Sequence, residues 1–236
     1  SYIATLAKEI KDNDLDEDFT NKRDDFNFIE ADSYNIKGVI KELCIRAKEK
    51  GLEPLAALIM LQRIEMPLEE AAKGYVSAEK EVASAEEAIA GAKDIIAEHI
   101  SDEANYRMKI RDITVKEGKI SSVAKDKEAE SVYEMYYEFE EAISKLAGHR
   151  ILALNRGEKE KVLTVKVEAP EEKILLYLEK QVIVSDNVHT TPVLKDVIAD
   201  SYKRLIAPAI EREIRNDLTE KAEDGAIEVF GKNLVQ

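Results

Sequence analysis

The sequence predicts a mainly α-helical protein, namely an array of several helices with a small β element and a long C-terminal helix. The 236 residues include 44% hydrophobic residues, which is enough to form a core, but only nine glycines and five prolines. Charged residues make up 36% of the chain, and Ala, Glu, Lys, Leu and Ile are abundant. This composition favours helices over a sandwich or barrel. Along most of the chain, apolar residues also recur at steps of three and four, as they do on one face of a helix.

Residues 1–45 are predicted to form an acidic helical segment. The first 32 residues contain ten acids against four Lys or Arg. Alternating aspartates in "DNDLD" invite a calcium-loop interpretation. However, Glu17 stands where such a loop needs glycine, and Arg23 stands where it needs a bidentate glutamate. We therefore predict an acidic helical connection here and no metal site.

Residues 46–190 are predicted to form a helical domain with a short β element. A helix predicted over residues 33–50 leads into this domain and ends at Gly51, and a short apolar helix follows in "LEPLAALIMLQRI". Pro67 opens another short helix that ends at Gly74.

The helix expected over residues 84–100 carries the clearest local signals. Ser84 and Glu87 have the spacing of a capping box. Gly91 lies on the apolar face, which predicts a close helix crossing rather than a break. A further helix is expected after Ser101, continuing to Glu117.

Two short strands are predicted, over residues 119–124 ("KISSVA") and 161–168 (including "VLTVKV"). Between them lies a tyrosine-rich stretch, "VYEMYYEFEEAI". A tyrosine cluster can stack bases, but the glutamates here would repel a nucleic-acid backbone, so we predict packing. The stretch "SKLAGHRILALNR" predicts a helix that ends at Gly157. Pro170 opens the next helix, and a loop is expected between Val184 and Thr191.

Residues 191–236 are predicted to form one long helix. Thr191 and Pro192 suit its N-cap and first turn, and apolar residues then recur to Leu234. Some forty residues at 1.5 Å each give a length of about 60 Å, with a kink expected at Pro208. The chain begins on Ser and ends while this apolar pattern is still running. We therefore expect a fragment of a longer protein in which this central helix is truncated.

No combination of residues predicts catalysis. The histidines His99, His149 and His189 lie in different segments, and no phosphate loop or metalloprotease motif accompanies them. Cys44 lies on the apolar face of its helix, where a buried inert thiol is expected. We predict no enzymatic activity, no catalytic residue, no metal and no cofactor.

The expected location is the cytoplasm. A single cysteine excludes an intramolecular disulfide, which fits a reducing compartment. No signal peptide or membrane-spanning run is recognisable in the sequence.

Nucleic-acid contact would require a local basic face, because the net charge is −14. Cations gather at the predicted helix-to-strand corner and on the long helix. The weak candidates for phosphate contact are Arg150, Arg156, Lys159, Lys161, Lys203, Arg204, Arg212 and Arg215. In the alternative interpretation, which the pattern favours, Arg212 and Arg215 pair with Glu211, Glu213 and other acids along their helix. Arg150 and Arg156 would then form ion pairs between the predicted helix-to-strand turn and neighbouring acids.

Four blocks in order resemble one family. They are "EKGLEPLAALI", "EEAIAGAKDIIAEHISDEANYRMKIRD", "ISKLAGHRILALNRGEKEKVLTVKV" and "DSYKRLIAPAIEREIRNDLTEKAEDGAIEVFGKNL". They resemble Tex, the bacterial transcription accessory family related to a eukaryotic elongation factor. The similarity runs from about Arg46 to Gln236. Residues 1–45 depart from the helix-turn-helix-like segment and basic linker usual in the family.

The resemblance implies an elongated nucleic-acid-binding protein. Its parts would be an N-terminal helical region, a ribonuclease-H-like domain without catalytic residues, helix-hairpin-helix elements and a C-terminal RNA-binding domain. This chain would be the helical part that ends before the ribonuclease-H-like domain. Most RNA or DNA affinity would then lie in domains absent here.

We therefore expect a helical scaffold that positions nucleic-acid-binding domains and contacts RNA polymerase or other transcription proteins. The alternative is an acidic protein-interaction module that docks a basic partner and makes no direct nucleic-acid contact. No membrane contact is expected in either case.

Overall fold

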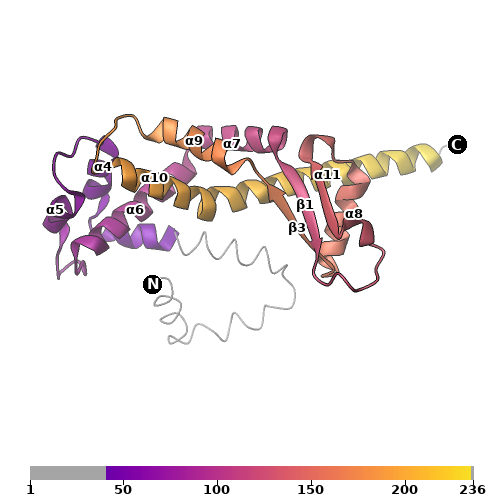
Figure 1. Cartoon of the computed structure of the whole chain (residues 1–236), viewed down its shortest axis with the longest axis horizontal. Coiled ribbons are helices and arrows are strands. Elements are labelled where there is room, and N and C mark those ends of the chain that lie inside the picture. Colours follow the sequence, from indigo (N-terminus) through magenta and orange to yellow (C-terminus); the bar gives the residue numbers. More distant parts are fainter. Residues whose placement is uncertain (1–40, 235–236) are drawn as a thin grey trace. The chain divides into compact units, whose positions relative to one another are not determined.

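The computed structural model describes residues 41–234, with side chains up to residue 227, and these residues belong to one compact unit. Within this part, the helical residues 41–49, eight further α-helices and one three-stranded antiparallel sheet confirm the mainly α fold class (Figure 1). The calcium-like stretch and most of the acidic segment 1–45 lie outside the described residues.

The first group of helices follows the sequence prediction closely. Residues 41–49 are helical, and α4 (Glu53–Leu61), α5 (Leu68–Ala72), the 3₁₀ turn Lys73–Tyr75 and α6 (Ala85–Asp102) follow. The Glu87 backbone N–H donates to Ser84 Oγ at 3.2 Å, which confirms the cap of α6. A Cβ added at Gly91 would lie 3.3 Å from Ala47 Cβ in the helix 41–49 and 2.5 Å from Leu52 Cδ1, so the predicted close crossing is also confirmed.

A small sheet follows the helix α7 (Ala104–Glu117). It consists of β1 (Lys119–Ala124), β2 (Glu138–Ala142) and β3 (Leu163–Glu168) in the order β2-β1-β3. β1 and β3 confirm the two predicted strands, although β3 begins two residues later than expected. β2 was not predicted, because "EFEEA" is too polar to stand out as a strand and depends on its pairing with β1. In the stretch before β2, Tyr133 and Tyr136 are buried, so two of its tyrosines do pack as predicted.

The helix α8 (Gly148–Lys159) continues past Gly157, so the predicted end at that glycine was wrong. A Cβ at Gly157 would lie 2.6 Å from Leu163 Cδ1 and 3.2 Å from Tyr133 Cδ1. The glycine is therefore needed for the close approach of α8 to β3 and not to end the helix. The helix α9 (Glu171–Val182) follows directly after β3.

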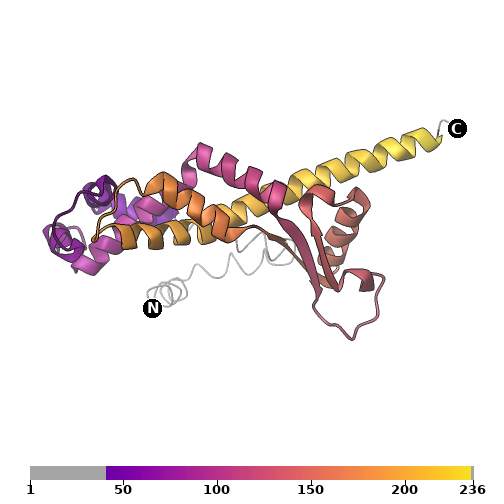
Figure 2. The same ribbon diagram turned by 45° about the horizontal axis from the view of Figure 1, so that its top comes forward.

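The long C-terminal helix consists of α10 (Thr191–Ser201), a π-helical turn (Tyr202–Ile206) and α11 (Ala207–Leu234), which follow one another without a break (Figure 2). The cap position is Thr190 rather than the predicted Thr191, and its side chain makes no cap hydrogen bond. The irregularity expected at Pro208 lies just before it. Pro208 has no N–H to donate to the Arg204 carbonyl four residues before it. The Ala207 N–H donates to the Tyr202 carbonyl, five residues before it, which is the hydrogen bond of a π-helix.

Much of the core lies where four helices pack against this long helix, while α4 and α5 pack against α6. α6 and α9 pack against α10, whereas α7 and α8 pack against α11. Ile96 and Ile198 are among the fully buried side chains of this core. None of the helices in the described part of the chain combines the length and apolar character needed to cross a membrane.

Candidate nucleic-acid interface

The turn between α8 and β3 brings three of the predicted basic residues together. Arg156 and Lys159 lie in the last turn of α8, and Lys161 follows with φ of 61°. The turn is closed by hydrogen bonds from the Lys161 N–H to the Glu158 carbonyl and from the Val162 N–H to the Gly157 carbonyl, both 2.9 Å. Because the turn is this tight, the three exposed cations are held near one another.

Lys125 joins them, and sequence reasoning missed it. Its backbone N–H donates to the Val162 carbonyl at 2.9 Å, directly beyond the last β1–β3 pair. The sequence did contain a signal for Lys125, because the two predicted strands could pair in antiparallel fashion. The end of the first strand then lies beside the start of the second. We call Lys125, Arg156, Lys159 and Lys161 the turn cluster. Among the described residues, none of the four makes an ion pair, and the exposed acids Asp126 and Glu160 lie beside them in sequence.

Arg150 and Arg215 instead hold the structure together. Arg150 Nη1 lies 2.7 Å from Glu141 Oε2, and its guanidinium lies 5.8 Å from the ring centroid of Phe139. This confirms the expected tie between Arg150 and an acidic neighbour. Arg215 pairs with Glu158 of α8 and donates to Asn155 Oδ1 at 3.3 Å, so the expected pairing along its own helix was wrong.

The remaining candidates lie on the long helix. Arg204 pairs with Asp200 and lies 3.8 Å from Asp94 Oδ1 of α6, whereas Lys203 is exposed and Arg212 is half-buried. Lys203 borders a cavity that includes Val167, at the end of β3 far from the turn cluster. The six residues of β3 span about 20 Å, so the eight candidates do not form one surface.

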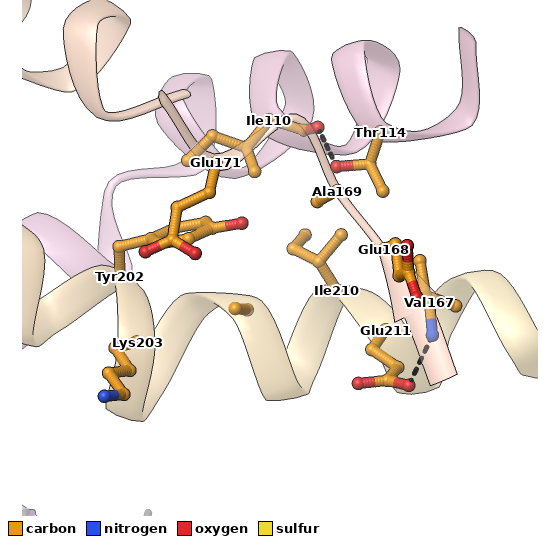
Figure 3. Close-up of a pocket in the computed structure, with 11 residues that line it drawn as sticks. Ile110, Thr114, Val167, Glu168, Ala169, Glu171, Tyr202, Lys203, Ile210 and Glu211 are labelled. Carbon is orange, nitrogen blue, oxygen red and sulfur yellow. Dashed lines mark hydrogen bonds between the residues drawn. The ribbon is translucent and has the colours of Figure 1, made fainter. Parts of the chain in front are cut away.

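The cavity beside Lys203 has a volume of about 380 Å³ (Figure 3). It lies between α7, the β3–α9 connection and the long helix. Its lining combines apolar side chains, three glutamates, one lysine and the buried Tyr202. Burial, with added repulsion from Glu171 and Glu211, raises the pKa of Tyr202 to about 12. Burial also raises the pKa of Glu211 above its usual range, although its carboxylate accepts the Val167 N–H at 2.9 Å.

Cys44 is buried, as expected. Its Sγ donates to Glu98 Oε2, and burial followed by the Glu98 carboxylate raises the pKa of the thiol to about 12. The thiol is therefore protonated at neutral pH and is a poor nucleophile. Within residues 41–234, no group of three or more His, Cys, Asp or Glu side chains is placed to hold a metal ion.

Comparison with known proteins finds one family model and several relatives that match most of this chain. The family described as "Tex central region-like" matches residues 65–230. YdcI of Bacillus subtilis is 53% identical over 191 residues, which cover 80% of this chain and 27% of YdcI. "Transcriptional accessory protein Tex" of Neisseria gonorrhoeae is 29% identical over 195 residues, covering 80% of this chain and 25% of that protein. Human "S1 RNA-binding domain-containing protein 1" is 29% identical over 206 residues, covering 81% of this chain and 20% of that protein. The chain thus spans about a quarter of the length of these relatives.

Proposed function

The chain belongs to the Tex family, and on this premise we propose that residues 41–234 are a helical scaffold within a transcription accessory protein. The scaffold would hold the nucleic-acid-binding parts of the protein at fixed positions and contact RNA polymerase or other transcription proteins. The proposal assigns it no catalytic role and no cofactor.

One observation carries the proposal, namely the unbroken helical path from Thr191 to Leu234. Four helices pack against it along its length. At 1.5 Å per residue, 44 residues extend about 65 Å. A rod braced in this way can keep two attached parts at a constant separation, which a flexible linker cannot do.

Nucleic-acid binding is proposed mainly for parts of the protein outside this chain. A relative is named for its S1 RNA-binding domain, and this chain covers only a fifth of that relative. With its net charge of −14, the chain repels phosphates on average. The turn cluster would then add only weak contacts to the phosphate backbone.

The scaffold role is tested by measuring distances along the rod. Spin labels would be placed on Ala199→Cys in α10 and Glu223→Cys in α11, both exposed positions, in a Cys44→Ala background. These positions lie about 35 Å apart along a continuous helix. Double electron-electron resonance should give one narrow distribution near that value. A broad or bimodal distribution would show that the π turn is a hinge and would refute a rigid scaffold.

Nucleic-acid binding by the chain itself is tested by salt-dependent titration. Fluorescently labelled single-stranded RNA and duplex DNA would be titrated at 50 and 150 mM salt. We expect Kd of about 10⁻⁴ M or weaker at low salt, and a further loss at 150 mM. The double variant Lys159→Glu/Lys161→Glu should weaken binding about tenfold.

The matched control is Lys109→Glu/Lys180→Glu, which reverses two exposed lysines on α7 and α9 without breaking an ion pair among the described residues. Equal loss in both double variants would mean that only net charge matters. No binding at 50 mM salt would remove the turn cluster as a phosphate contact and favour the acidic interaction module.

A further inference from the structure

The cavity beside the π turn is separate from the turn cluster and has different chemistry. Its walls include the apolar side chains of Ile110, Ala169 and Ile210, from three different elements. Glu168, the last residue of β3, and Glu171, the first residue of α9, are exposed and border the cavity. A long side chain entering from outside would therefore pass carboxylates and then meet apolar walls.

Tyr202 places in the lining of the cavity a hydroxyl that has no partner among the described residues. Its side chain is 4% exposed, and Figure 3 shows the hydroxyl extending into the cavity. No described residue forms a hydrogen bond with this hydroxyl, and the atom is not sealed from solvent, because it is not one of the buried polar atoms that lack a partner. The group is therefore placed to interact with something that enters the cavity.

Glu211 supplies a half-buried negative charge further along the long helix, and Figure 3 shows Ile210 between it and Tyr202. One oxygen of its carboxylate accepts the Val167 N–H, as the dashed line in Figure 3 shows. Among the described residues, neither Glu211, Glu168 nor Glu171 has an ion-pair partner. Lys203 is the only cation in the lining, so the cavity has a formal charge of −2.

These features together suit a guanidinium group. Its planar donor fork can be shared between a carboxylate and a hydroxyl oxygen, and it also stacks on aromatic rings. The alkyl stem of an arginine packs well against apolar walls. An ammonium group is more strongly hydrated and lacks the planar fork, so it fits less well. A phosphate would meet three carboxylates and one lysine, which excludes it on charge.

We propose that this cavity binds an arginine side chain presented by a protein partner, with the Glu211 carboxylate pairing with the guanidinium and the Tyr202 hydroxyl as a further acceptor in the same cavity. The inference rests on the cavity alone and does not depend on the scaffold function or on nucleic-acid binding. It assigns arginine binding to a cavity whose three glutamates make phosphate contact unfavourable.

The test uses N-acetyl-arginine amide as the probe, titrated into the ¹⁵N-labelled chain and followed by two-dimensional NMR. A single capped residue should bind with Kd on the order of millimolar. The Val167 amide, which donates to Glu211, should be among the signals that shift most. Glu211→Gln keeps an acceptor for that amide but removes the charge, and it should weaken binding at least tenfold. Tyr202→Phe keeps the ring and should weaken binding several-fold.

Three controls make the result decisive. The neutral isostere N-acetyl-citrulline amide should not shift these signals, and N-acetyl-lysine amide should bind more weakly than the arginine probe. Glu220→Gln, at an exposed position of α11 away from the cavity lining, should leave Kd unchanged. Equal binding of arginine and citrulline, or binding unaffected by Glu211→Gln, would overturn the proposal. Much tighter binding of free L-arginine than of the capped probe would overturn the assignment to a protein partner.

Discussion

The two halves of the long helix are held in place by different forces. In α10 and the π turn, the residues facing the neighbouring helices are mostly apolar. Leu194, Ile198 and Ile206 are fully buried, and α6 and α9 cover this half. Burial of such side chains contributes about 1.5 to 3 kcal/mol each and depends little on salt.

Both halves make ion pairs to their neighbours, but among the described residues α11 carries the least exposed of them. Arg107 of α7 lies 2.5 Å from Glu213, Arg111 of α7 pairs with Asp217, and Arg215 pairs with Glu158 of α8. Asn155 of α8 also donates to Thr219 at 2.8 Å. Ion pairs and hydrogen bonds fix orientation but depend on salt and pH. The comparison teaches that one continuous helix can depend mainly on apolar packing at one end and add a largely buried ion pair, Arg215–Glu158, to its packing at the other.

The largest effect is expected from Ile198→Ala in the apolar half. Ile198 is fully buried, so the change leaves a cavity and should lower the free energy of unfolding by about 2 to 5 kcal/mol. Ile227→Ala makes the same substitution at a position of α11 that is 70% exposed. Denaturant unfolding should show a change below about 0.5 kcal/mol for this control. Similar losses for both variants would show that the first half is not the anchor.

A smaller effect is expected where charge dominates, at Arg215 and Glu158. Their side chains are 18% and 13% exposed. A double-mutant cycle with Arg215→Met and Glu158→Gln should give a coupling energy of about 1 to 2 kcal/mol that falls in 1 M salt. Glu158→Gln keeps an acceptor for the Val165 N–H. The control cycle uses Lys73 and Glu70, which are 65% and 60% exposed, and should give less than about 0.5 kcal/mol. Equal coupling in the two cycles would contradict the comparison.

The smallest effect is a pH dependence at Glu211. Folding raises the pKa of this carboxyl from its ordinary value of 4.5, so the folded protein holds the proton more tightly than the unfolded chain. The contribution of Glu211 to stability is therefore greatest at low pH and is lost as pH rises from about 4.5 through the raised folded pKa. Glu211→Gln cannot ionise, so its Tm relative to wild type should be higher at pH 8 than at pH 4.

Asp94 also has a pKa raised by burial, but it is present in both proteins and cancels in this difference. Glu220→Gln, at an exposed position, serves as the control. If the Tm difference between Glu211→Gln and wild type is the same at both pH values, the burial of Glu211 does not affect stability in this way.

The candidate site was only partly predictable. Arg156, Lys159 and Lys161 are close in sequence, so a tight turn keeps them together whatever the rest of the fold does. Lys125 is 31 residues or more away from them and reaches the cluster only through the pairing of β1 with β3. Arg215 looked equally available for phosphate contact, yet α8 supplies Glu158 and Asn155 as its partners.

The sequence by itself determined the features that depend on neighbours within four or five residues. These include the helix periods, the Ser84 cap, the two apolar-patterned strands and the long C-terminal helix. Tertiary structure decided the third strand, the role of Gly157, the partners of the arginines and the cavity around Tyr202. The physical reason is that each of these features depends on side chains and backbone groups from distant parts of the chain. Local periodicity does not determine which of these distant groups will come into contact.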